Sequence, residues 1–229
     1  MDHGSDGAAA HQAEAGRRSF EMSTVKEPYC GEGEKTMGFE IFEQLPGDEL
    51  PDAVAFPCGG GTGLVGMYKA FQELRTPGLG ERMPRLYAVQ PEGCAPIVRA
   101  LREDAPRVTP WEDPRTIAPG LLVVAPFASE RVLEAIRGSR GGGARVSDVE
   151  IVSAMRARAM THGVSVSPEG AALYAALAAL VRDRSIRAGE TALLYNTGSG
   201  LPFDVSELER VVGANASPPV VPAARSARE

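Results

Sequence analysis

The chain has 229 residues, of which 43% are hydrophobic, so it is long enough to bury a sizeable core. Its formal net charge of −6 argues against a nucleic-acid partner, because a phosphate backbone requires a concentrated basic surface. Three widely spaced cysteines without a CxxC motif, and the absence of a secretory signal or a bilayer-length apolar run, lead us to expect no disulfides, no metal site, no membrane contact and a cytoplasmic location.

The composition divides the chain into three parts. Residues 1–19 are small and polar without periodicity, which predicts a disordered N-terminal arm. Residues 214–229 are rich in Pro, Ala, Ser and Arg and predict a flexible C-terminal tail. Strand-like and helical patterns alternate between them, and we expect residues 20–213 to form one folded domain.

The first half of that domain alternates short apolar runs with helical spacing. The predicted elements are a buried strand at 53–56, an amphipathic helix at 64–74, a strand at 86–89, a helix at 94–101 and a strand at 121–125.

The second half continues the alternation after a glycine run at 141–143, which we expect to be a flexible surface loop. Ser147 is a good N-cap for a helix over 148–160, and Glu150 completes a capping box. The remaining predicted elements are a short strand at 164–166, a helix at 168–182 and a last strand at 191–195.

This order of elements predicts an α/β fold with three αβα layers and a mainly parallel sheet. In such sheets ligands bind beyond the carboxyl ends of the strands. Three polar, glycine-containing turns follow strands, at 59–63, 91–93 and 196–200, and they are predicted to converge on one crevice.

The first of these turns carries the strongest local signal, Cys58-Gly-Gly-Gly-Thr-Gly63 between a strand and a helix. Successive glycines let backbone N–H groups approach a phosphate, and the helix N-terminus adds a favourable dipole. The alternative is a tight crossover that needs small residues only for packing. A P-loop is excluded because no lysine follows Gly63, whereas the glycine spacing over 61–66, with Glu92 as ribose acid, keeps a dinucleotide site open.

Two further residues are weaker candidates by themselves. A hydroxyl of the turn 196–200 is placed to bond a ring nitrogen in the crevice, but Asn and Gly also suit an ordinary polar turn. Glu169 lies in the first turn of a helix, where an acid needs no catalytic reason. His162, before Gly163, reads as a residue at a helix end.

Several segments together resemble threonine synthase and its relatives, in the fold-type-II pyridoxal-phosphate family, in order and in spacing. They are residues 23–29, 32–38, 57–71, 84–85, 89–97, 168–172 and 197–201. The resemblance covers about residues 20–204 and implies the large-domain fold of that family (tryptophan synthase beta-like), incomplete at its N-terminal side.

The resemblance assigns roles to particular residues. It implies that the turn of Gly59, Gly60, Gly61, Thr62 and Gly63 cradles the phosphate of pyridoxal 5'-phosphate and that the Thr197 hydroxyl faces the pyridine nitrogen, with Glu169 near the cofactor. It further implies a lyase that converts O-phosphohomoserine, a small phosphorylated amino acid, to threonine and phosphate.

One feature of the family has no counterpart in this sequence, namely its Schiff-base lysine. Lys26, Lys35 and Lys69 are the only lysines, and none lies in the expected motif. We therefore expect a C-terminal half that is inactive alone, whether from a truncated gene, a mis-called start or a split enzyme, and that requires a complementary N-terminal half chain or a homo-oligomer. The alternatives are a non-catalytic phosphate- or cofactor-binding module, another amino-acid lyase of the family and, less favoured, an NAD(P)-binding domain.

Overall fold

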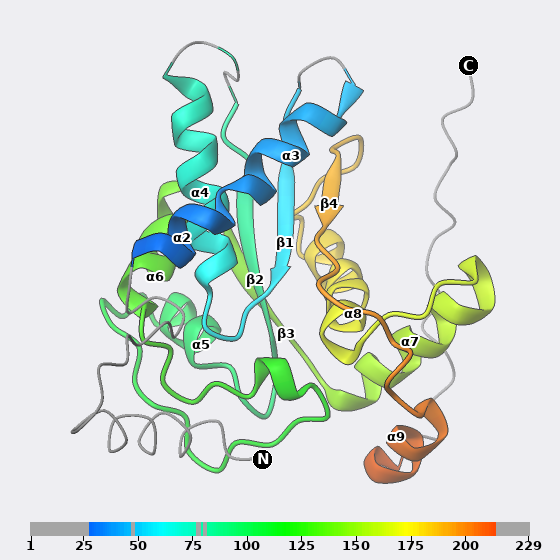
Figure 1. Cartoon of the computed structure of the whole chain (residues 1–229). Coiled ribbons are helices and arrows are strands. Elements are labelled where there is room, and N and C mark those ends of the chain that lie inside the picture. The colour runs from blue at the N-terminus through cyan, green and yellow to red at the C-terminus, as the bar shows by residue number, and fades with distance from the viewer. Residues whose placement is uncertain (1–27, 47–48, 77–78, 80–81, 214–229) are drawn as a thin grey trace, which may run out of the picture.

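The computed structural model describes residues 28–46, 49–76, 79 and 82–213 (Figure 1). The expected arm at 1–19 and tail at 214–229 lie outside the described residues. The elements are α2 (Pro28–Glu34), α3 (Thr36–Gln44), β1 (Ala53–Pro57), α4 (Thr62–Arg75), β2 (Arg85–Pro91), α5 (Pro96–Arg102), η2 (Pro119–Leu121), α6 (Ser129–Gly138), β3 (Gly142–Val146), α7 (Asp148–His162), α8 (Pro168–Arg182), β4 (Ala192–Leu194) and α9 (Val205–Val212).

The four strands form one sheet in the order β3-β2-β1-β4, and every pairing is parallel. In the centre, Ala55 of β1 lies opposite both Tyr87 of β2 and Leu194 of β4. Because the strands run in the same direction, their carboxyl ends meet at one edge of the sheet, the lower one in Figure 1. The prediction of a mainly parallel sheet is confirmed.

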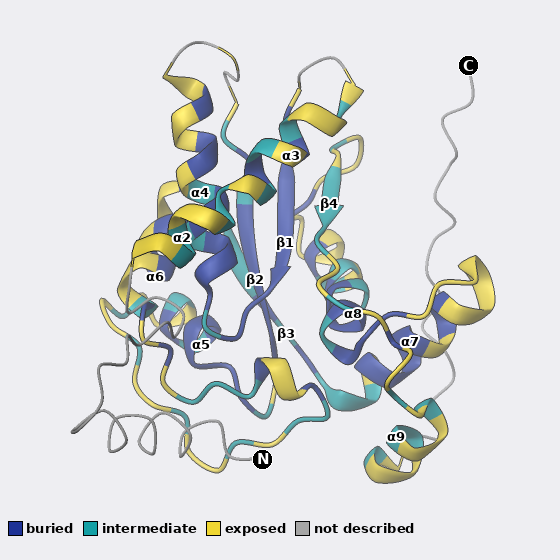
Figure 2. Ribbon diagram, in the orientation of Figure 1, coloured by how far each residue is buried: buried dark blue, intermediate teal, exposed yellow. Residues whose placement is uncertain are grey.

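Helices cover both faces of the sheet and make three layers (Figures 1 and 2). Side chains alternate along β1: Val54 and Phe56 enter the core shared with α3, α4 and α6, whereas Ala53 and Ala55 enter the core shared with α7 and α8. A strand with both faces covered must be apolar throughout, and all five residues of β1 are buried.

Most predicted elements are present at close to their expected positions. The helix expected at 64–74 begins two residues earlier, at Thr62. The capping box that starts α7 is confirmed: the Ser147 side chain accepts from the Glu150 N–H, and Glu150 Oε2 accepts from the Ser147 N–H at 2.8 Å. Gly163 ends that helix with φ +64°, directly after His162.

Three predicted elements were wrong. Residues 164–166 form no strand, because Val166 makes only an isolated antiparallel bridge to Ser199. Residues 121–125 form no strand, because Leu121 closes the 3-10 turn η2 as a buried anchor and the residues after it are only partly covered. The glycine run at 141–143 is no flexible loop, because residues 142–146 form the edge strand β3. A Cβ on Gly141 would lie 1.8 Å from the Leu86 carbonyl oxygen, so glycine is required there for close packing.

Within the described residues, no helix is long and apolar enough to cross a membrane. The strand β4 lies on the side of the sheet opposite to β3. Among the described strands it pairs only with β1, and its three residues are half-buried.

Candidate cofactor-binding site

The glycine turn follows β1 and leads directly into α4. Cys58 still belongs to the sheet, since its N–H donates to the Val89 carbonyl at 2.9 Å. The N-cap of α4, Gly61, adopts a left-handed conformation (φ +82°) and supplies no side-chain cap. Within the described part of the chain, the backbone N–H groups of residues 59–64 therefore have no hydrogen-bond acceptor.

The glycines of the turn serve different purposes. A Cβ on Gly59 would lie 2.4 Å from the Gly120 carbonyl oxygen, and one on Gly63 would lie 2.3 Å from the Phe56 ring. At Gly60, by contrast, the nearest atom is Thr62 Oγ1 at 3.9 Å. Gly59 and Gly63 therefore allow close packing, whereas Gly60 faces an open space beside the free N–H groups.

A buried glutamine holds the turn in place. Gln90, at the end of β2, is fully buried; its amide donates to the Cys58 carbonyl at 3.0 Å and accepts from the Val98 N–H at 3.0 Å. Gln90 was not singled out from the sequence. A polar residue inside an otherwise apolar strand, just before a turn, was the signal that marked it.

A cavity of about 330 Å³ lies beside the turn at the carboxyl edge of the sheet. Its lining combines the end of β1, η2, the start of α8 and the turn after β4: Pro57, Gly120, Leu121, Ser167, Glu169, Thr197, Gly198, Ser199 and Phe203. Segments more than a hundred residues apart thus share one hollow.

Glu169 and Thr197 both line this cavity, and different contacts hold them there. Glu169, in the first turn of α8, accepts the Gly120 N–H on Oε1 at 2.9 Å and so ties α8 to the loop that touches Gly59. The turn that carries Thr197 packs on the start of α8, where the Ser167 N–H donates to the Gly198 carbonyl at 3.2 Å. The Thr197 hydroxyl has no hydrogen-bond partner among the described residues.

The third predicted turn, 91–93, does not line the cavity. A Cβ on Gly93 would lie 1.9 Å from the Arg115 carbonyl oxygen, and the Glu92 N–H donates to Val146 at 2.8 Å. This turn therefore supports a loop and the edge strand β3. Of the three turns expected to converge, only 196–200 lines the cavity, whereas the glycine turn 59–63 lies next to it through the close approach of Gly59 to Gly120.

The cysteines near the turn are not nucleophiles. Burial raises the pKa of Cys58 to about 12, and burial also raises the pKa of Cys94. Thiolates are the reactive form, so both side chains are inert at neutral pH. Among the described residues, no cluster of His, Cys, Asp or Glu is arranged to hold a metal ion.

A family model for pyridoxal-phosphate dependent enzymes matches residues 2–198. The chain belongs to this family. It is similar to threonine synthase of Methanosarcina acetivorans (37% identical over 193 residues, 82% of this chain and 47% of the relative) and of Methanocaldococcus jannaschii (34% over 174 residues, 76% and 43%). The chain thus spans about half the length of the curated relatives it matches.

The fold of the chain is shared with solved fold-type-II enzymes. The processed form of threonine deaminase isoform 2 from Solanum lycopersicum has a TM-score of 0.62 and 24% identity, over 82% of this chain and 47% of that chain. At this level of identity the likeness shows the fold, and it confirms the fold class expected from the sequence.

The residues of the glycine turn fit the phosphate of this family's cofactor. N–H groups without an acceptor among the described residues, a helix N-terminus without a side-chain cap and the open space at Gly60 provide donors and room for a phosphate group. The Thr62 hydroxyl, beside Gly60, has no partner among the described residues and adds a donor.

The lysines of the described residues lie elsewhere. Lys35 pairs with Glu32 at 2.6 Å and with Glu73 at 2.9 Å, and Lys69 pairs with Glu32. These contacts join α2 to α4, away from the residues that line the cavity. Lys26 lies outside the described residues.

Proposed function

We propose that this chain is one half of a threonine synthase-like lyase, namely the half that binds the phosphate and the ring of the cofactor. The complete enzyme would convert O-phosphohomoserine to threonine and phosphate. Residues 20–213 make up its cofactor-binding domain. The observation that carries the proposal is the juxtaposition of a glycine cradle, with unpaired N–H groups, and a cavity lined by Glu169 and Thr197. The thiols of Cys58 and Cys94, which form no disulfide within the described residues, suit the reducing cytoplasm in which we place the chain.

The cradle binds the cofactor phosphate. The N–H groups of Gly59, Gly60, Gly61 and Gly63 and the hydroxyl of Thr62 donate to phosphate oxygens, and the positive end of the α4 dipole faces the dianion. Because Gln90 fixes the Cys58 carbonyl, these donors are aligned before the phosphate arrives.

The cavity receives the ring. When bound, pyridoxal phosphate supplies an electron sink for the amino-acid substrate. The Thr197 hydroxyl, which lines the cavity, would be the neutral partner of the pyridine nitrogen and would leave the ring a milder electron sink than a carboxylate partner would. Glu169 acts as a positioning residue, because its carboxylate holds the Gly120 N–H and hence the loop that lies against Gly59.

The chain alone does not turn over, because no lysine of the described residues reaches the cavity. A lysine is needed to attach the cofactor and to move protons. The partner that supplies it is a complementary N-terminal half, because a second copy of the chain carries only the same three lysines. The free side of β4, whose residues are half-buried, offers backbone groups for a further strand.

The test is reconstitution. The 229-residue chain is assayed for threonine formation from O-phosphohomoserine, alone and after co-expression with the N-terminal half of a similar threonine synthase. We expect no threonine from the chain alone and measurable formation from the pair. Turnover by the chain alone contradicts the missing-lysine proposal, and a stable but inactive pair favours a non-catalytic binding module.

The reconstituted pair is also assayed with Gly60→Asp, which fills the cradle with a carboxylate and should abolish threonine formation, and with a matched control variant. Gly33→Asp places the same charge on the exposed surface of α2, where a Cβ meets nothing within 4 Å. If the reconstituted pair keeps its activity with Gly60→Asp, the cofactor phosphate does not bind at the glycine turn.

A further inference from the structure

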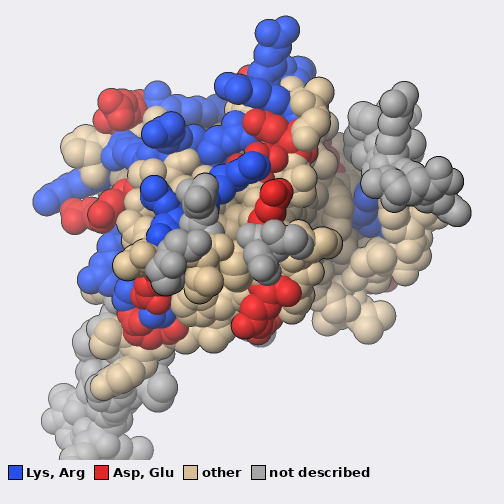
Figure 3. Space-filling model, turned by 90° about the horizontal axis from the view of Figure 1, so that it is seen from above, with Lys and Arg blue, Asp and Glu red and all other residues tan. Residues whose placement is uncertain are grey.

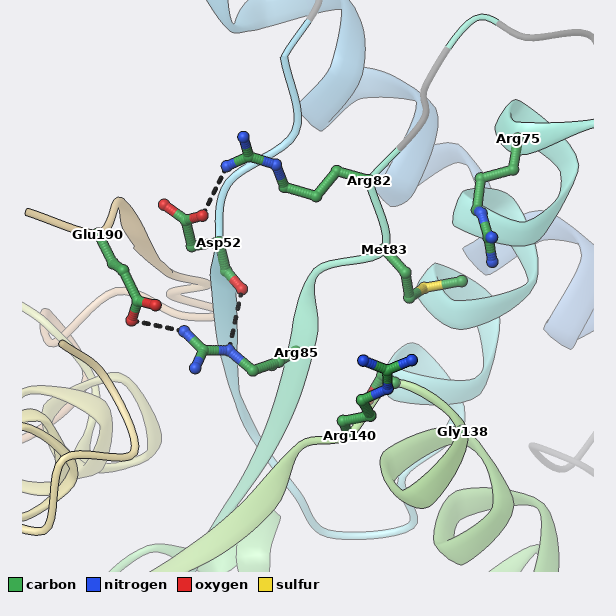
Figure 4. Close-up of a pocket in the computed structure, with 9 residues that line it drawn as sticks. Asp52, Arg75, Arg82, Met83, Arg85, Gly138, Arg140 and Glu190 are labelled. Atoms are coloured by element: carbon green, nitrogen blue, oxygen red, sulfur yellow. Dashed lines mark hydrogen bonds and ion pairs between the residues drawn. The ribbon is translucent and has the colours of Figure 1, made fainter.

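A second cavity, of about 430 Å³, lies at the opposite edge of the sheet, beside the amino ends of β1 and β2 (Figure 4). We call it the arginine pocket. It is lined by Asp52, Arg75, Arg82, Met83, Arg85, Gly138, Ser139, Arg140 and Glu190. On the molecular surface, basic side chains gather on this face with carboxylates between them (Figure 3).

Both carboxylates of the pocket are already engaged. Asp52 accepts Arg82 on Oδ1 at 2.6 Å and the Thr191 N–H on Oδ2 at 2.9 Å. Glu190 Oε2 accepts Arg85 and the Arg187 N–H, both at 2.6 Å. The Arg187 N–H and then the Arg85 guanidinium hold the pKa of Glu190 below its usual range, so this carboxylate remains charged.

Two arginines remain without a counter-charge. The guanidinium groups of Arg75, in the last turn of α4, and of Arg140, after α6, make no ion pair or hydrogen bond with any described residue. Figure 4 shows both guanidinium groups directed toward the space around Met83. Among the described residues that line the pocket, four arginines face two carboxylates, which is an excess of two positive charges.

We propose that the arginine pocket binds a small polyanion that carries a polyphosphate group. Guanidinium groups are planar forks that donate paired hydrogen bonds to phosphate oxygens. Arg75 and Arg140 clamp the anion from opposite walls, whereas Arg82 and Arg85 are held at the rim by Asp52 and Glu190. A single chloride offers neither the charge nor the acceptor oxygens to satisfy two forks.

The pocket is separate from the cofactor cradle. The two sites lie at opposite ends of α4, whose 14 residues place them about 20 Å apart at 1.5 Å per residue. An anion in the arginine pocket therefore cannot touch the cofactor phosphate, and its binding can be measured independently of the proposed lyase function.

The test is calorimetric titration of the 229-residue chain with inorganic tripolyphosphate, in the presence of excess pyridoxal phosphate. The variant Arg75→Gln/Arg140→Gln is compared with Arg107→Gln/Arg182→Gln, whose arginines are exposed beside Glu130 and Asp183, away from the pocket. Both double variants remove two positive charges, so they separate a site from a general charge effect. Circular dichroism verifies that each variant is folded.

We expect one tripolyphosphate per chain, at least a tenfold loss of affinity in the pocket variant and less than a twofold change in the control. Affinity in the native chain should fall as salt rises, because the site is exposed. Titration with ATP distinguishes recognition of a nucleotide from recognition of the polyphosphate alone. Absence of binding, competition by pyridoxal phosphate, or an equal loss in both double variants would overturn the proposal.

Discussion

We propose an anion site at each end of the parallel sheet, and the two sites differ in their donor groups. At the carboxyl end the donors are neutral N–H groups and hydroxyls of a glycine turn, fixed by Gln90 and by contacts to Gly120. At the amino end the donors are charged arginines, exposed except for the half-buried Arg85 and partly balanced by Asp52 and Glu190. The difference teaches that alignment of backbone dipoles replaces net charge where a ligand must be held in one orientation.

Among the substitutions at the carboxyl end, Gly60→Asp should have the largest effect on cofactor affinity. The added carboxylate occupies the space above the turn, accepts the free N–H groups and repels a phosphate. We expect affinity for pyridoxal phosphate to fall about 100-fold, or ~2.7 kcal/mol. Thermal stability should hold, because an acid is favourable at a helix N-terminus. Fluorescence titration measures the affinity, with Gly33→Asp as the control; equal affinities in both variants would contradict the cradle.

Gln90→Leu tests whether alignment at the carboxyl end depends on one buried side chain. The change leaves the Cys58 carbonyl and the Val98 N–H without partners, and we expect it to cost about 2 kcal/mol of unfolding free energy. Urea denaturation measures that cost. Gln72→Leu, on the exposed side of α4, should change it by less than about 0.5 kcal/mol. An unchanged midpoint for Gln90→Leu would show that the turn holds its shape unaided.

Thr197→Val tests the ring contact with a near-isosteric side chain. Loss of the hydroxyl should weaken binding of pyridoxal phosphate about tenfold, while binding of inorganic phosphate stays the same. The comparison of the two ligands separates the ring from the cradle. Thr161→Val, at the end of α7, is the control. A parallel loss for both ligands would mean that the turn as a whole has been disturbed.

The smallest expected effect is the contribution of the buried Cys58 thiol to the pH dependence of stability. The pKa of Cys58 is raised from 9.0 to about 12 by burial, so the folded state binds its proton more tightly than the unfolded state. The stability from this group is complete below pH 9 and is lost as pH rises toward 12, at about 1 kcal/mol between pH 9 and 10. Urea denaturation over that interval should show this slope in the native chain and a shallower one in Cys58→Ala.

Much of the fold follows from local sequence. The apolar run of β1, the amphipathic stripe of α4, the capping box of α7 and the start of α8 at Pro168 are each decided by neighbours within a few residues, and their predictions were confirmed. The strand expected at 121–125 failed because its apolar residues anchor a loop over the cavity. The strand β3 was missed because its glycines are set by the approach of Leu86 and Val98, which no local pattern reveals.

The candidate site, like the fold, could be predicted from the sequence only in part. The glycine turn was recognisable because its chemistry is contiguous in sequence. The link from Gly59 through Gly120 to Glu169 was not, because it joins three separate segments through one close approach and one hydrogen bond. The arginine pocket escaped notice for the same reason, since its four arginines come from the end of α4, the approach to β2, the start of β2 and the turn after α6.

The central claim, a phosphate cradle without its cofactor-bearing lysine, is tested most directly by trapping. The chain is incubated with pyridoxal phosphate, reduced with borohydride and mapped by mass spectrometry, while a thermal shift reports binding. We expect stabilisation by pyridoxal phosphate and by phosphate without a stoichiometric lysine adduct. A single stoichiometric adduct at Lys26, Lys35 or Lys69 would contradict the claim and make the chain a self-sufficient cofactor carrier.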